Sequence, residues 1–173
     1  MTGLDPLRPE PARSDPSSGA ALTTDESPAL RDALSVAARI SEDETQADEA
    51  RLRYQAEGLP QLDVDDRVAP MRREDESVHA VHPGAMLEHG MSGDNGAHLV
   101  GGTLYVTSQR LVHVAEEPTE VALGDVEEMA IALERLLLIR LRGELDLAID
   151  VAHPRLLRVQ IAAAKAAGRG RGR

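Results

Sequence analysis

The sequence lacks cysteine altogether among its 173 residues. This absence excludes disulfide bonds, zinc sites built from cysteine, iron–sulfur clusters and thiol nucleophiles. Phenylalanine and tryptophan are also missing and there are only two tyrosines, although 42% of the residues are hydrophobic. The core must therefore be built from Leu, Val, Ile, Ala and Met.

Long hydrophobic runs are absent as well. The most apolar run near the middle of the chain, residues 136–139, is far shorter than the roughly 20 residues that a membrane-spanning helix needs. The first residues, MTGLDPLRPEPARSD, contain acids and prolines but none of the apolar stretch that is typical of a signal peptide. We therefore expect a cytoplasmic protein.

Acidic residues outnumber basic ones, which gives a formal net charge of −11 at pH 7. Most of the excess acid lies before residue 72, so this part of the chain should repel nucleic acid and anionic lipid. Lys165 is the only lysine, and every other basic side chain apart from histidine is an arginine. The codon usage of a GC-rich bacterial genome explains this bias as well as selection for guanidinium chemistry does.

The first 73 residues divide into three segments by composition. Residues 1–26 are rich in Pro, Ser and acids and are predicted to be disordered. Residues 27–58 are predicted to be helical, in two runs that could pair with each other, lie on the following domain or fold only with a partner. Residues 59–73 are predicted to be an extended linker.

Short apolar runs at near-regular spacing follow from residue 74 and predict about seven antiparallel strands. The first run, VHAVHPGAMLEHG, is predicted to be short and interrupted by Pro-Gly. The clearest hairpin is GGTLYVTSQRLVHV, residues 101–114, in which Leu104 and Val106 point to one side and Tyr105 to the other. Asp94-Asn95-Gly96, in the glycine-rich loop before it, predicts a turn.

The last apolar segment, PRLLRVQIAAAKAA, predicts an amphipathic helix. Pro154 suits the first helical position, and Leu157, Ile161 and Ala164 form one apolar stripe. The final GRGRGR is too rich in glycine to continue a helix. We therefore expect a folded domain over residues 74–167 and a basic Arg-Gly tail over residues 168–173.

Three segments together resemble the pleckstrin-homology (PH)-like superfamily, and within it the GRAM-type and bacterial PH-like domains. They are GGTLYVTSQRLVHV, EVALGDVEEM and the helical LLRVQIAAA. The resemblance implies a mainly β (α+β) fold, a seven-stranded antiparallel barrel or sandwich capped by a C-terminal helix, preceded here by a helical and disordered N-terminal extension. The fold hosts lipid-binding, peptide-binding and structural roles, so it does not by itself name a function.

Phosphoinositide-binding members of this superfamily use a basic cluster in the first inter-strand loop. Here the sequence has no lysine or arginine between Arg73 and Arg110. Phosphate recognition favours charged donors, so we do not expect inositol-phosphate binding at that loop.

Catalytic and metal-binding patterns are missing from the sequence. GxSxG, HExxH and paired-ligand spacings do not occur, and His79 and His82, three residues apart on a predicted strand, should face opposite ways. We therefore expect no enzyme, catalytic residue, metal, cofactor or small-molecule substrate.

The remaining candidates for interaction are exposed polar and basic positions. Arg110 is interpreted either as an anion or partner contact or as a structural arginine, which is paired with a nearby acid such as Asp125 or Glu127 or left solvated. The last 19 residues contain no acid and could contact a membrane or RNA, or serve only as a solubilising end. The candidate interaction residues are Tyr105, Arg110, Arg155, Arg158, Lys165, Arg169, Arg171 and Arg173.

These features favour a non-enzymatic PH-like binding or adaptor module with a protein partner. The alternative is a peripheral, lipid-binding GRAM-type domain that meets an anionic membrane through its basic C-terminal tail. Nucleic acid is the least favoured partner, because the chain is acidic and its tail has no aromatic side chain to stack on bases.

Overall fold

The computed structural model describes residues 27–64, 66–89, 99–143 and 146–170. The predicted disordered segment, the Asp94-Asn95-Gly96 turn, Arg171 and Arg173 lie outside these ranges. In chain order the elements are α1 (Pro28–Glu57), η1 (Ala69–Met71), β1 (Val78–His89), β2 (Val100–Thr107), β3 (Arg110–Val114), β4 (Thr119–Ala122), η2 (Leu123–Asp125), β5 (Val126–Ala132), β6 (Leu136–Leu141), β7 (Asp146–Asp150) and α2 (Pro154–Gly170).

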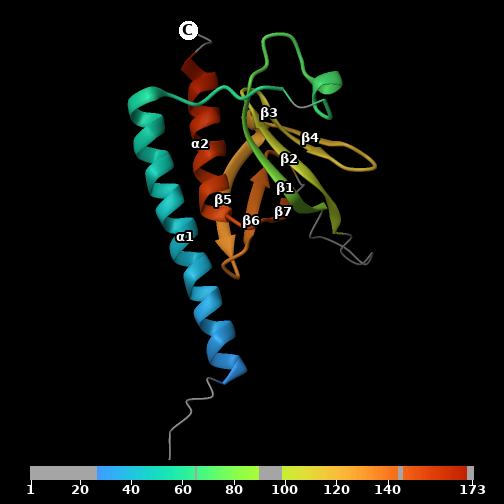
Figure 1. Ribbon diagram of the computed structural model, residues 1–173. Helices are drawn as coiled ribbons and strands as arrows, with labels where there is room; N and C mark the ends of the chain where they lie inside the picture. The colour runs from blue at the N-terminus through green and yellow to red at the C-terminus, as the bar shows by residue number, and fades with distance from the viewer. Residues whose placement is uncertain (1–26, 65, 90–98, 144–145, 171–173) are drawn as a thin grey trace, which may run out of the picture.

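The seven strands form one antiparallel sheet in the order β4-β3-β2-β1-β7-β6-β5, and α2 lies against it (Figure 1). This arrangement confirms the predicted fold class, seven antiparallel strands followed by a C-terminal helix. The two strands at the ends of the order, β4 and β5, are joined in sequence by η2.

β1 connects the two halves of the sheet. It is one strand of 12 residues, so the interruption predicted at Pro83-Gly84 occurs as a local irregularity within the strand and not as a break. Gly84 has a φ of +72°, and the pairing with β2 shifts register between Pro83 and Ala85, which marks a bulge. Proline is tolerated there because a bulge leaves a ladder position unpaired. Beyond the bulge the strand also pairs with β7, from Met86 to His89.

The main core lies between the sheet and α2 and is aliphatic, as the composition predicts. Leu157, Ile161 and Ala164 are fully buried, which confirms the apolar stripe predicted for this helix. Burying one Leu or Ile side chain contributes about 1.5–3 kcal/mol, so this stripe fixes the helix on the sheet. The strand residues of this core include Leu104, Val106, Leu137, Ile139, Leu147 and Ile149.

The other face of β2 is also covered. The side chain of Tyr105 is fully buried in a second cluster with Val68, Val78 and Val112. Val68 belongs to the segment predicted to be an extended linker, which instead packs on the sheet and places Leu62 in a β-bridge with Val78. The linker prediction overlooked this segment because its apolar residues are widely spaced.

The helices differ from their predicted extents. α1 is one continuous helix of 30 residues rather than two runs, and only its second half packs against α2, where Ala47 and Ala50 meet Val159. α2 continues to Gly170, although it was predicted to end at residue 167. Glycine costs a helix only about 1 kcal/mol relative to alanine, so it weakens a helical end without forbidding it.

A buried aspartate of α1 caps the start of α2. The Asp43 carboxylate is 2% exposed and accepts hydrogen bonds from the backbone N–H groups of Arg155 and Leu156, at 2.9 and 3.0 Å. The carbonyl of His153 accepts the first bond of the helix, so His153 holds the capping position but has no side-chain oxygen to fill it. Asp43 supplies that oxygen from another helix, and its charge complements the positive end of the helix dipole.

We predict that Asp43→Asn destabilises the fold by about 2 kcal/mol, because the amide cannot accept both bonds and a buried donor is left unsatisfied. Urea unfolding measures the effect. Glu49→Gln is the matched control, since Glu49 is exposed on the same helix. Equal unfolding midpoints for the two variants would rule out this role for Asp43.

Candidate functional site

Arg110 lies in the interior, which agrees with its interpretation as a structural arginine and not with that of a surface contact. Its side chain is 3% exposed, and its Nε and Nη2 donate to Oε1 and Oε2 of Glu76 at 2.9 and 3.0 Å. It also donates to the carboxylate of Glu120 and the carbonyl of Met71. Its partners are therefore not Asp125 or Glu127. The segment before β1 lies beside the start of β3 and brings Glu76 to this position.

Tyr105 is likewise unavailable to a partner, because the segment before β1 covers its side of the strand. The hairpin that contains both residues is thus a structural element, and the two predicted contact residues that it supplied are wrong. Sequence alternation placed Tyr105 on the face away from the main core, but it could not show that this face is covered.

The pKa of Glu76 is set by opposing effects. Burial raises the pKa, but the hydrogen bonds from Arg110, the backbone N–H of Arg73 and the hydroxyl of Thr107 favour the charged form. The net result is a pKa below the ordinary value of 4.5. Glu76 is therefore ionised at neutral pH and holds Arg110 as a buried ion pair.

The basic residues of α2 are not gathered in one patch. Arg155 is engaged by Asp43 and Glu44 of α1 and by Glu134 in the turn between β5 and β6. The Lys165 amine donates to the carbonyl of Val126. Arg169 is exposed in the last turn of the helix.

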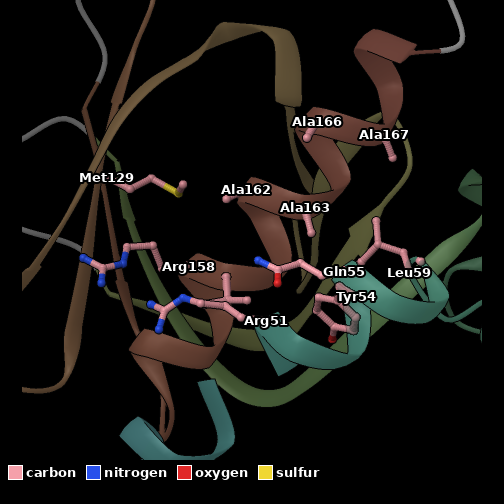
Figure 2. Close-up of a pocket in the computed structure, with 12 residues that line it drawn as sticks. Arg51, Tyr54, Gln55, Leu59, Met129, Arg158, Ala162, Ala163, Ala166 and Ala167 are labelled. Atoms are coloured by element: carbon pink, nitrogen blue, oxygen red, sulfur yellow. The ribbon is translucent and has the colours of Figure 1, made fainter. Parts of the chain in front are cut away.

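A groove of about 610 Å³ opens between α1, α2 and β5 (Figure 2). It exists because α1 ends at Glu57, whereas α2 continues beside the opening. Gly58, which has a φ of +80°, turns the chain away from the helix axis. The lining is mostly apolar, and its size is that of small-ligand and peptide pockets. Its apolar lining includes Tyr54 within α1 and Leu59 just after it. The other apolar residues are Met129 of β5 and four alanines of α2, Ala162, Ala163, Ala166 and Ala167.

Two arginines mark one end of this groove. Figure 2 shows the guanidinium groups of Arg51 and Arg158 together, away from Ala166 and Ala167. Both also line the adjoining hollow beside Glu44. Arg51 pairs with the exposed Asp48. Within the described part of the chain, partly buried Arg158 has no ion pair or hydrogen bond from its side chain. Its charge is therefore open to a ligand.

The sequence identified Arg158 as a candidate but missed Arg51. The signal for Arg51 is its spacing, four residues after buried Ala47 and three before Tyr54, at the edge of the face that meets α2. Asp43 and Glu76 were also missed. The signal for Asp43 was its spacing, because it lies three residues after Ile40 and four before Ala47, where the helical pattern calls for an apolar residue.

The histidines make separate contacts. His79 Nδ1 lies 2.6 Å from the carbonyl oxygen of Pro60, and His82 Nε2 lies 2.7 Å from Oε1 of Gln160 on α2. Burial lowers the pKa of His82 and outweighs the opposing effect of Gln160. Among residues 27–170, leaving out the three undescribed gaps, no three metal-binding side chains converge.

Neither the family models nor the curated proteins contain a match to this sequence. Among solved structures, the chain is similar to the Vps36 N-terminal PH domain, with 15% identity over 64% of this chain and 92% of that one and a TM-score of 0.46. It is also similar to the C-terminal domain of an unknown protein from Leishmania infantum, with 8% identity over 51% and 84% and a TM-score of 0.40. The structure itself shows one sheet of seven antiparallel strands followed by a C-terminal helix.

No described helix has the length and hydropathy that crossing a membrane requires.

We predict that Glu76→Gln lowers the free energy of unfolding by about 3 kcal/mol at neutral pH, because it leaves Arg110 buried without its full countercharge. The stability from ionised Glu76 is fully present above its ordinary pKa of 4.5 and is lost as the pH falls through the lower folded value. The difference between variant and parent should therefore shrink below about pH 4.5.

Urea unfolding between pH 3 and pH 7 measures this dependence. Glu74→Gln provides the control, since Glu74 is exposed two residues away. A difference from the parent that stays constant over this range would contradict the pKa assignment.

Proposed function

We propose that the protein is a non-enzymatic binding module, and that the groove between α1 and α2 receives an apolar helix of a partner protein that carries a carboxylate. The observation that carries this proposal is the combination of an apolar lining with the unpaired Arg158 at one end. The predicted candidates Arg155 and Lys165 are already engaged within the chain, so they contribute less.

The shape of the groove supports a helix as the occupant. The exposed side of α2 presents alanines, which let a second helix approach closely, at interaxial distances of about 8 Å. A helix of the partner would lie along α2 and bury its own apolar face. This mode, an amphipathic helix laid in a hydrophobic groove, recurs among peptide-binding proteins.

The charge of the groove supports a carboxylate on that helix. A guanidinium group offers paired donors that match a carboxylate. Arg158 is partly buried, so a hydrogen-bonded carboxylate would be less screened than at an open surface. Arg51 adds a second positive charge on the same side.

The alternative, peripheral membrane binding through the C-terminal tail, stays a prediction. It draws on the exposure of Arg169 and on the sequence positions of Arg171 and Arg173. Such binding would depend on charge and would weaken with salt.

A pair of synthetic peptides tests the groove. One is a fluorescein-labelled Leu/Ala helix with a central Glu, and its twin carries Gln. We expect the Glu peptide to bind about tenfold more tightly to the parent protein, because hydrogen bonds to charged groups are strong. Arg158→Gln should abolish this preference, whereas Arg169→Gln on the same helix should preserve it. Fluorescence polarisation measures each affinity.

The groove itself is tested by Ala166→Trp. The larger side chain should fill part of the groove and so lower the affinity of the protein for both peptides. Binding that is unchanged in both Arg158→Gln and Ala166→Trp would overturn the groove proposal. Co-sedimentation with anionic liposomes separates the alternative. Salt-sensitive binding that is lost in Arg169→Gln/Arg171→Gln/Arg173→Gln, with no peptide binding, would support the membrane module instead.

A further inference from the structure

The N-terminal half of α1 extends beyond the rest of the domain (Figure 1). Residues 28–39 are all exposed, and three large apolar side chains lie among them. Leu30, Leu34 and Val36 are 49%, 54% and 41% exposed. A half-helix of this length without tertiary packing is only marginally stable in water, so a covering surface would stabilise it.

One side of this half-helix, formed by Ala33, Val36 and Ile40, continues the face that packs on α2. Ala47 and Ala50 make that contact. Ile40 and Ala33 lie seven and fourteen residues before Ala47, and Val36 lies fourteen before Ala50. Residues at heptad spacing share one side of a helix. α1 therefore presents a helix-pairing surface along its whole length, and α2 covers only the second half of it.

We propose that the first half of α1 pairs with the same half of a second copy of this chain, in antiparallel orientation, to form a dimer. The two-fold axis would lie between positions 35 and 36. The groove proposed as a partner site is formed by the other half of α1, so this inference does not depend on it.

The charges beside this face favour a second copy over an unrelated partner. Asp32 and Arg39 lie seven residues apart on one flank of the face, and neither has an ion pair in the described part of the helix. Antiparallel pairing about this axis places Asp32 of each copy opposite Arg39 of the other, so the dimer has two equivalent pairs of opposite charge. Such self-complementarity is what a two-fold interface requires, and parallel pairing would set like charges together.

A hollow beside α1 provides room for the second helix. It has a volume of about 530 Å³ and lies between Val36, Arg39 and Ile40 of α1 and Leu133 in the turn between β5 and β6. Leu133 has a φ of +50° and is 81% exposed. Covering this exposed leucine would bury apolar surface, which is favourable. In the proposed register, the first turn of the second copy's helix enters this hollow.

Sedimentation velocity over a range of protein concentrations tests the dimer. The contact is only about 20 Å long, so we expect a reversible dimer whose population rises with concentration. Asp32→Arg and Arg39→Asp should each raise the dissociation constant of the dimer about tenfold, because each creates two like-charge pairs. The double variant Asp32→Arg/Arg39→Asp should restore it. These positions are exposed, so the fold should be unaffected.

The apolar face is tested separately. Val36→Asp should abolish the dimer, whereas Leu52→Asp, at a position that is 68% exposed on the second half of the same helix, should leave it unchanged. Circular dichroism and urea unfolding check that each variant is folded. A protein that stays monomeric at all concentrations, or a double variant that fails to recover association lost in the single variants, would overturn the proposal. Unchanged peptide binding by these variants would keep it separate from the function of the groove.

Discussion

The carboxylate of Asp43 joins α1 to α2 by accepting a hydrogen bond from Arg155, which lies 112 positions later in the chain. Its two hydrogen bonds meet the first turn of α2, so α1 is attached at the end of its partner rather than only along its side. Ala47, Ala50 and Val159 then close the contact with small side chains. Because the attachment lies near the middle of α1, one half of the helix borders a groove and the other half is left uncovered.

Charged residues are divided between the interior and the surface by whether the fold supplies a partner. Arg110 is buried because Glu76 and Glu120 reach it, and Arg155 is held by three carboxylates. Arg158, one turn further along α2, meets none within the described residues. The same residue type thus serves as a structural element at one position and as an available contact at another, according to what the neighbouring segments bring.

The sequence predicted the parts of the fold that local patterns determine. Alternation gave the strands, and the stripe of Leu157, Ile161 and Ala164 gave the buried face of α2. Contacts between distant segments could not be predicted in this way, since no local pattern pairs Glu76 with Arg110 or covers Tyr105. Of the candidate site, Arg158 was found from its position off the apolar stripe of the helix. The groove was not, because it depends on where α1 ends relative to α2.

The shared strand β1 has a consequence for how the chain reaches this structure during synthesis. β1 leaves the ribosome early, but its pairing with β7 requires residues 147–150, which emerge about 60 residues later. α1 must wait even longer for the start of α2. Until then the apolar faces of α1 and β1 lack their intramolecular partners, so the nascent chain passes through a stage in which chaperones are best placed to bind it.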